Sequence, residues 1–235
     1  MNAAQFLENS SVSDEVWKLH PDYVAMLLVV EGIQGGESDE RSEELLLEAE
    51  TSAAELLAAM PIEEVPEVQL WREKFLSFGV KPRVAKSSSE ALLKRCASGM
   101  PRVNLLTDLY NAVSVINMVP IGGEDFDAYV GPARLVIADG SENFDTRENG
   151  ETVNESPEPG EVIWRDDSGV TCRRWNWRQC VRTRLTEETT NAFFIFDGVG
   201  VDAQARVESA VAQLTEKLSE WWPGVVITSK ELSKS

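Results

Sequence analysis

Apolar residues recur along the chain with two spacings, and each spacing predicts one kind of element. Residues 23–33 are rich in Val and Leu and lead into the Gly35-Gly36 turn, which predicts a buried strand. In residues 202–222 apolar side chains stand at helical spacing and Pro223-Gly224 follows, which predicts a helix. Composition and residues that begin or end helices predict further helices at 39–60, 67–78 and 104–118. Another helix is predicted from a capping box at Ser87–Glu90 to Gly99.

The second half of the chain has the alternation and turn residues that are typical of strands. Strands are predicted at 134–138, 161–165, 170–175 and 191–197, and residues 166–169 join the middle two into a hairpin. The acidic segment 140–160, rich in Pro and Gly, is expected to be a loop with one short hairpin. Helices and strands in this order predict an α+β fold. Without a repeat or a linker-like composition, residues 1–235 are expected to form a single domain.

The charge changes this picture, because 22 Lys and Arg stand against 40 Asp and Glu, for a net charge of −18. Hydrophobic residues (43%) and charged residues (26%) occur at the levels of folded domains, which excludes a disordered or fibrous chain. Two basic islands interrupt the acidic background, at residues 72–102 and 173–184. Such islands either bind phosphates or form ion pairs within the protein.

No apolar run approaches the ~20 residues of a membrane-spanning helix, and the first 12 residues lack the features of an export signal. The three cysteines have no CxxC spacing, which argues against a disulfide framework and a thiolate zinc site. We therefore expect a cytoplasmic protein without a membrane partner.

Several kinds of chemistry are excluded by what the chain lacks. His20 is the only histidine, so a catalytic triad or a multi-histidine metal site would have to be built on it alone. An isolated histidine is more often a packing or surface residue. Neither a GxGxxG nor a P-loop motif occurs. We expect no metal and no cofactor.

Three segments place polar groups on predicted apolar elements. Asn111 lies within the most apolar helix, where a buried amide is costly unless it is used by a ligand or by the backbone. Gly122-Gly123 is followed by three carboxylates within four residues, so it is either an oxyanion-binding loop or a plain tight turn. Residues 172–178 interleave Arg and Trp, which can grip a single-stranded RNA end or form core and ion pairs.

Around these segments the sequence resembles a known family. NLLTDLYNAVSVINMVPIGGEDFD (104–127), PGEVIWRDDSGVTCRRWNWRQ (159–179) and RTRLTEETTNAFFIF (182–196) occur in the order found in stand-alone B3/B4-domain proteins. Those proteins are similar to the editing domain of the phenylalanyl-tRNA synthetase beta subunit. The resemblance covers about residues 70–200.

The resemblance implies a B3/B4-like α+β fold of mixed and antiparallel strands flanked by helices, and a pocket that hydrolyses mischarged aminoacyl-tRNA in trans. One branch of the stand-alone proteins removes canavanine from arginine tRNA. The position that matches the pocket histidine of the synthetases is Gly122 here. A glutamate of the synthetase pocket corresponds to the neighbourhood of Arg184. The polar lining of the pocket therefore differs from that of the synthetases.

The roles that follow are expectations carried by the resemblance. The backbone N–H groups of Gly122 and Gly123, with Asn111, are the expected catalytic groups that stabilise the oxyanion. The expected substrate-binding residues are Glu124, Asp125, Asn176, Thr186 and Thr190. The expected tRNA-binding residues are Arg173, Arg174, Trp175, Trp177 and Arg178. A pocket rich in carboxylates favours a guanidinium-like side chain, as in canavanyl-tRNA(Arg), over tyrosine.

Two other functions are compatible with the sequence. One is a non-catalytic module of the same fold that binds tRNA or another RNA, which the absent histidine favours. The other is a sensor or hydrolase for free amino acids, which the net charge of −18 favours.

Overall fold

The computed structural model describes residues 1–148 and 150–234, and its strands form two larger sheets and one hairpin. The four-stranded sheet has the order β11 (Val226–Leu232), β2 (Tyr23–Glu31), β10 (Asn191–Val199) and β3 (Ile121–Asp125), with all neighbours antiparallel. The central strands β2 and β10 are almost continuously apolar because both faces of this sheet are covered.

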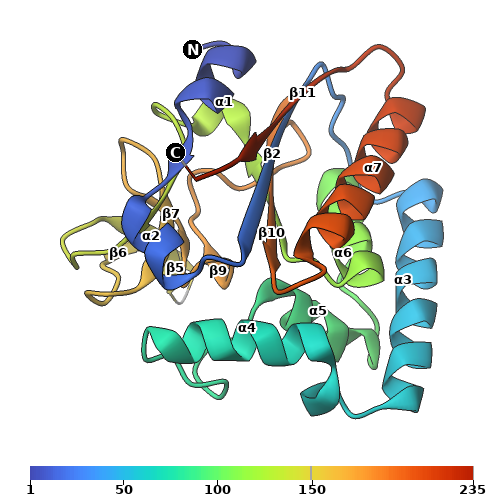
Figure 1. The fold of residues 1–235 in the computed structure, drawn as a ribbon. Helices are drawn as coiled ribbons and strands as arrows, with labels where there is room; N and C mark the ends of the chain where they lie inside the picture. Colours follow the sequence, from blue (N-terminus) through green and yellow to red (C-terminus); the bar gives the residue numbers. More distant parts are fainter. Residues whose placement is uncertain (149, 235) are drawn as a thin grey trace.

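Helices α6 (Leu105–Asn117) and α7 (Ala203–Trp221) cover one face of the four-stranded sheet, and α3 (Glu40–Ala59) packs against the outer side of α6 (Figure 1). Leu28, Val30 and Phe194 point toward them and share a core with Leu46, Leu109 and Leu214 of these helices. Alternate residues of the same strands point to the opposite face.

The opposite face packs against the second sheet and the N-terminal helices α1 (Ala3–Asn9) and α2 (Asp14–Leu19). The second sheet has the order β1 (Ser11–Val12), β4 (Arg134–Ile137), β7 (Val162–Arg165), β8 (Val170–Arg173) and β9 (Arg178–Gln179). Leu27, Val29 and Phe193 meet Phe6 and Trp164 in this second core. The protein thus has three layers, with the four-stranded sheet in the middle.

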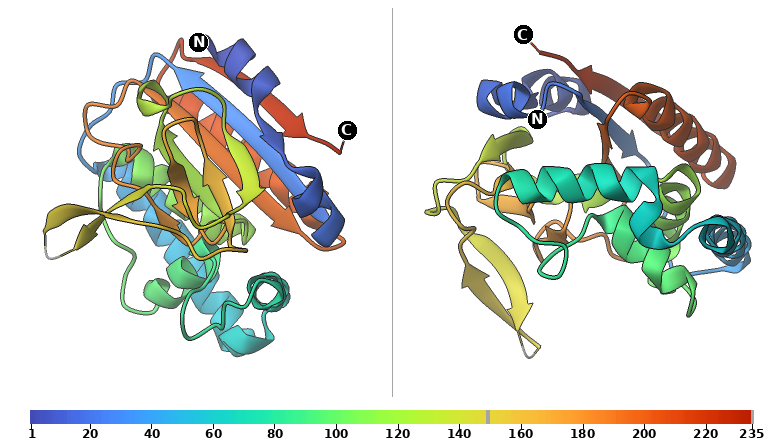
Figure 2. Two further views of the ribbon diagram at one scale, coloured as in Figure 1. Left: turned by 90° about the vertical axis from the view of Figure 1, so that its left-hand side faces the viewer. Right: turned by 60° about the horizontal axis from the view of Figure 1, so that its bottom comes forward.

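Helices α4 (Pro66–Ser77) and α5 (Ser88–Cys96) lie across one end of these layers (Figure 1). The hairpin of β5 (Phe144–Glu148) and β6 (Glu151–Glu155) projects from the second sheet, as Figure 2 shows in yellow. Short 3-10 helices occur at η1 (Ile62–Glu64) and η2 (Phe126–Ala128). Within the described part of the chain, no helix has the length and apolar character needed to cross a bilayer.

The α+β class is confirmed, and the helices and strands predicted from the sequence occur within a few residues of their expected limits. The hairpin expected within 140–160 is β5–β6, and its residue 149 lies outside the described residues. Ser87 caps α5 as expected, but Glu90 does not close a capping box, because its carboxylate bonds to Arg72 at 2.7 Å instead.

Six helices and strands were not predicted: α1, β1, α2, β3, β9 and β11. The tight-turn interpretation of residues 122–123 is wrong, because both glycines lie inside β3 and pair with β10. Glycine is a weak strand former, so the sequence pattern gives no strand signal there. The strand forms because β10 supplies a neighbouring edge, with Phe194 opposite Gly123.

Candidate functional site

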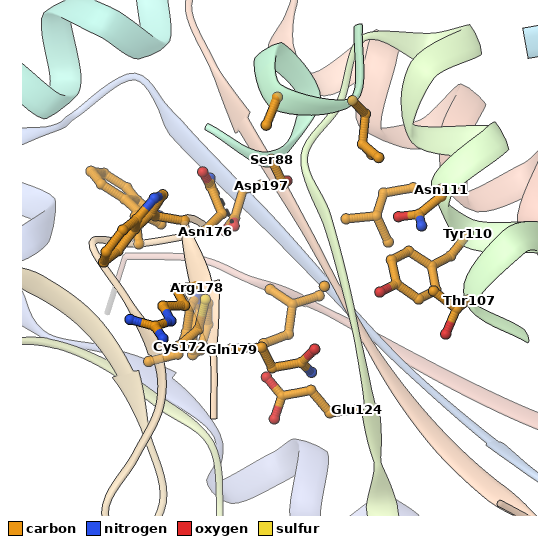
Figure 3. Close-up of a pocket in the computed structure, with 18 of the residues that line it drawn as sticks. Ser88, Thr107, Tyr110, Asn111, Glu124, Cys172, Asn176, Arg178, Gln179 and Asp197 are labelled. Atoms are coloured by element: carbon orange, nitrogen blue, oxygen red, sulfur yellow. Dashed lines mark hydrogen bonds between the residues drawn. The ribbon is translucent and has the colours of Figure 1, made fainter. Parts of the chain in front are cut away.

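A cavity of about 320 Å³ lies where α5, α6, β3 and the end of the second sheet meet. Helix α6 contributes Thr107, Tyr110 and Asn111 on one side, and Asn176, Arg178 and Gln179 lie opposite, as Figure 3 shows. Glu124 on β3 and Asp197 on β10 supply two carboxylates. The pocket thus gathers side chains from parts of the chain more than 80 residues apart, from Asn111 to Asp197.

Glu124 is a buried carboxylate in this pocket, with an exposed fraction of 1%. Its Oε2 atom has no hydrogen-bond partner among the described residues. Burial raises the pKa of Glu124 to about 7, and hydrogen bonds from Tyr129 and Thr183 only partly oppose this rise. An acceptor with this pKa can exchange a proton near neutral pH.

Asp197 is the second buried carboxylate, with an exposed fraction of 2%. The Tyr23 hydroxyl donates to its Oδ1 at 2.5 Å, and the Asn176 amide donates to its Oδ2 at 3.3 Å. Burial raises the pKa of Asp197 to about 7 despite these two donors. Two carboxylates thus share one pocket, and neither forms an ion pair with a described residue. A bound cation would stabilise the ionised form of both.

Most of the buried polar atoms that lack a partner gather in this pocket. They are Glu124 Oε2, Asn176 Oδ1, Ser88 Oγ and the Nε1 atoms of Trp164 and Trp175. The two indoles lie near Asp197 and help to lower its pKa, but neither makes a hydrogen bond of good geometry. Buried polar atoms are otherwise nearly always bonded in proteins, so Glu124 Oε2, Asn176 Oδ1 and Ser88 Oγ indicate a site for a polar ligand.

The end of β8 is shaped by two successive residues in left-handed conformation, Arg174 with φ 48° and Trp175 with φ 67°. Positive φ is unusual for residues with large side chains and costs about 1–2 kcal/mol for each residue. The turn directs Trp175 into the molecule, where it is fully buried and the indole contacts His20 at a ring distance of 4.8 Å. His20 is therefore a packing residue behind the pocket wall, and burial lowers its pKa.

Asn111 faces the pocket from α6 (Figure 3). Its amide makes no hydrogen bond to any described side chain or backbone group, although the residue is only 8% exposed. The alternative in which the backbone uses this amide therefore does not hold within the described part of the chain. Asn111 offers a free donor and a free acceptor to a ligand.

The two predicted catalytic glycines face opposite sides of β3. At Gly122 a Cβ atom would meet nothing within 4 Å, because this position borders the pocket. At Gly123 a Cβ atom would lie 2.6 Å from Cε1 of Tyr110, so this glycine lets the tyrosine ring pack on the strand. Gly122 therefore belongs to the site, whereas Gly123 supports it from behind.

The arginines that were expected to bind tRNA are mostly engaged within the protein. Arg173 is 6% exposed and forms ion pairs with Glu161 at 2.7 Å and Glu155 at 3.0 Å. Arg174 pairs with Glu161 at 3.1 Å and stacks on the ring of Trp177 at 4.3 Å. Neither guanidinium is free for a phosphate. Trp175 is buried, so the expected role as an exposed stacking platform does not fit this residue.

Trp177 and Arg178 both line the pocket. The side chain of Arg178 is 38% exposed, and its distance to Glu155 is 4.0 Å. Trp175 lines the same pocket but is fully buried, so Trp177 and Arg178 are the partly exposed residues of the predicted tRNA-binding set at the pocket.

Three of the predicted substrate-binding residues lie outside the pocket. Asp125 accepts hydrogen bonds from Thr189 Oγ1 at 2.9 Å and from the Asp127 backbone N–H at 3.0 Å. Thr186 and Thr190 are exposed on the loop before β10. From the predicted site, the structure brings together Asn111, Gly122, Glu124 and Asn176 in the pocket. Asp125, Thr186 and Thr190 do not line it.

Asp197 is the main site residue that the sequence analysis missed. A carboxylate inside the apolar run FFIFDGV is a buried charge, and such a residue indicates either a functional group or a paired ion. Ser88 and Gln179 were also missed, and nothing in their local sequence marks them. Cys96, Cys172 and Cys180 are free thiols, and the described residues contain no group of three His, Cys, Asp or Glu side chains that could hold a metal ion.

Comparison with known proteins gives the following matches. The N-terminal fragment of the phenylalanyl-tRNA synthetase beta subunit from Pyrococcus horikoshii is similar in structure, with a TM-score of 0.46 and 16% identity, over 96% of this chain and 54% of that one. The chain thus spans about half the length of that fragment. No curated protein matches the sequence. The B3/4 domain family matches residues 70–219, which is more than half of the chain and includes every residue of the pocket, and the protein therefore belongs to the B3/4 domain family.

Proposed function

We propose that the protein is a trans-editing deacylase that hydrolyses the ester bond of a mischarged aminoacyl-tRNA. The observation that carries this proposal is the pocket with two buried carboxylates and several unbonded polar atoms. Its volume of about 320 Å³ suits one amino acid rather than a larger molecule. Membership of the B3/4 domain family supports the same reaction class, through the editing activity that the resemblance implies.

An aminoacyl ester is already activated, so hydrolysis requires a positioned water and a donor for the developing oxyanion. We assign Glu124 the role of general base rather than that of binding the ammonium group of the substrate. Its Oε2 atom has no partner among the described residues, and its pKa is about 7. Water attacks the ester carbon as Glu124 takes its proton. The tetrahedral intermediate then collapses, the bond to the ribose oxygen breaks, and the proton returns to that oxygen.

Asn111 is the donor that we assign to the oxyanion, because its amide is free and faces the pocket. The pairing of Gly122 with β10 makes its backbone N–H a less suitable donor than a side chain that can turn. Gly122 contributes space instead, since no side chain fills the pocket at this position.

Asp197 and Asn176 are the groups that we assign to the side chain of the amino acid. Both present oxygen acceptors, and an ionised Asp197 needs a cationic partner. A guanidinium-like side chain supplies planar N–H donors and a positive charge, which suits these acceptors better than tyrosine does. Canavanyl-tRNA(Arg) is therefore the substrate to test first.

The experiment is a deacylation time course against canavanyl-tRNA(Arg), arginyl-tRNA(Arg) and tyrosyl-tRNA(Phe). We expect release from canavanyl-tRNA(Arg), with arginyl-tRNA(Arg) spared. Glu124→Gln and Asn111→Ala should abolish release, whereas Asp125→Asn is the matched control, since this neighbouring carboxylate lies outside the pocket. Release from tyrosyl-tRNA(Phe) alone would overturn the assignment of a cationic substrate. No release at protein concentrations that bind tRNA would leave a non-catalytic tRNA-binding module.

A further inference from the structure

The two basic islands differ in how far their charges are neutralised. In the second island four of the five arginines form ion pairs, namely Arg173, Arg174, Arg178 and Arg182, and the exposed Arg184 makes none with any described residue. In the first island, Arg72, Lys74, Lys94 and Arg102 are paired with acidic side chains. Its remaining cations make no ion pair with any described residue: they are Lys81, Arg83, Lys86 and Arg95. We call these four residues the α5 cationic surface.

Acidic residues are absent from the sequence around this surface. No Asp or Glu occurs between Glu73 and Glu90, although the protein has 40 of them. Glu90 is fully buried and accepts ion pairs from both Arg72, at 2.7 Å, and Lys94, at 3.2 Å. Its single negative charge therefore does not neutralise the surrounding cations, and the region is positive within a protein of net charge −18.

The position of the α5 cationic surface is fixed by burial of its apolar neighbours. Val80 and Ala85 are buried in the core shared with the second sheet, so the loop between α4 and α5 is held against the protein (Figure 2). Lys81 and Arg83 are exposed on this loop. Ser87 then caps α5. The part of this helix that lines the pocket begins at Ser88 and ends at the exposed Arg95.

We propose that the α5 cationic surface binds the sugar-phosphate backbone of the acceptor end of tRNA. This proposal rests on the proposed function, because it is the tRNA that delivers the ester to the pocket. Unpaired Lys and Arg side chains bind phosphates by releasing condensed counterions, whereas arginines already paired with buried carboxylates do not. The exposed face of α3 carries Glu40, Glu44 and Glu48 and repels RNA, which leaves the α5 side for its approach.

Binding of uncharged tRNA tests the surface independently of hydrolysis. The test variant is Lys81→Glu/Arg83→Glu/Arg95→Glu, in which three exposed cations are reversed. The matched control is Lys18→Glu/Lys217→Glu/Lys230→Glu, which changes the net charge by the same amount on α2, α7 and β11. Dissociation constants of a tRNA(Arg) transcript are measured by fluorescence anisotropy over a range of salt concentrations.

We expect the test variant to bind about a hundredfold more weakly, and its salt dependence to decrease by about two to three units of slope. The control triple should bind within about threefold of the wild type, since its charges lie outside the contact. Equal loss in both triples would show a net-charge effect only and would overturn the proposal. Unchanged binding by the test variant, or a greater loss in Arg174→Ala/Arg178→Ala, would also overturn it.

Two further readouts keep the result unambiguous. Far-UV circular dichroism and thermal melting establish that each triple is folded. If the test triple is unfolded, the single variant Arg95→Glu is measured instead, with an expected loss of about tenfold. If the wild type binds tRNA through this surface but releases no amino acid, the deacylase proposal is wrong and the proposal that the α5 cationic surface binds tRNA is supported.

Discussion

The ring of Tyr110 lies so close to Gly123 that a Cβ atom on this glycine would be 2.6 Å from Cε1 of the ring. Helix α6 therefore approaches β3 at a position where a side chain would separate the two elements. This contact places Tyr110 and its neighbour Asn111 at the pocket. The two adjacent glycines thus have different roles: Gly123 lets the ring of Tyr110 pack against β3, and Gly122 leaves the pocket open.

Alanine at each glycine separates these purposes. Gly123→Ala should destabilise the protein by about 1–3 kcal/mol, because the new methyl group collides with an aromatic ring. Gly122→Ala should change stability by less than about 0.5 kcal/mol, since its Cβ enters open space. Urea unfolding of both variants measures the difference. Equal destabilisation of the two would contradict the packing described for β3.

Glu124 should make stability depend on pH. Its pKa is about 7 in the folded protein against an ordinary value of 4.5, so the folded state binds the proton more tightly. The stabilisation from this proton is complete below pH 4.5 and is lost as the pH rises through 7. Glu124→Gln does not titrate in this range. Between pH 4.5 and pH 8 the free energy of unfolding of the wild type should therefore decrease, relative to that of Glu124→Gln, by on the order of 2–3 kcal/mol.

This pH dependence is measured by urea unfolding of the wild type and of Glu124→Gln at pH 5 and pH 8. Asp125→Asn serves as the control, since it removes a carboxyl group that accepts hydrogen bonds outside the pocket. A stability difference between wild type and Glu124→Gln that does not change with pH would show that Glu124 titrates normally.

Turnover should follow the same ionisation in the opposite direction. A general base acts in its deprotonated form, so the deacylation rate should rise with pH and level off above about 7. Asp197 titrates in the same range and gives the profile a second ionisation. The profile is measured with a buffer series on one mischarged tRNA. A rate that is flat from pH 5.5 to pH 8 would exclude Glu124 as the base.

Asp197→Asn should change which amino acid is removed. The variant keeps a side chain of the same shape that can still accept from the Tyr23 hydroxyl, but it loses the negative charge. We expect kcat/KM for a cationic aminoacyl group to decrease by at least about tenfold, with a smaller effect on a neutral one. Equal effects on canavanyl-tRNA(Arg) and tyrosyl-tRNA(Phe) would mean that Asp197 has no role in selectivity.

The buried ion pair of Arg173 and Glu161 should matter for stability rather than for RNA. Arg173→Ala leaves Glu161, only 2% exposed, with Arg174 as its remaining partner. Removing one member of a buried pair costs about 3–5 kcal/mol. Thermal unfolding measures this loss, and tRNA binding by the residual folded protein should match that of the wild type.

The sequence indicates most of the elements because their signals are local. The apolar runs of β2 and β10 and the helical spacing of α7 are properties of consecutive residues, and each element occurs where it is predicted. The short elements α1 and α2 escape prediction because six or seven residues carry little periodicity. Strand β3 depends on its pairing with β10, which is a long-range contact.

The candidate site divides in the same way. Asn111 and Glu124 are notable from sequence alone, as polar residues on or beside apolar elements. Which basic residues are neutralised depends on acids far away in the chain, and a count of charges does not reveal it. Glu161 and Asp166 pair with Arg173, Arg174 and Arg182, whereas the four residues of the α5 cationic surface have no such partner among the described residues.

The sequence by itself therefore determined the α+β class, the main helices and strands, the resemblance to the B3/B4 proteins and part of the pocket lining. Only the tertiary structure decided that Asp197 joins Glu124 in one cavity, that Asp125 and Thr186 lie outside it, and which arginines are already paired. The physical reason is the distance along the chain over which each kind of interaction acts. Periodicity and capping act within a few residues, whereas burial, pKa and ion pairing depend on what the fold brings together.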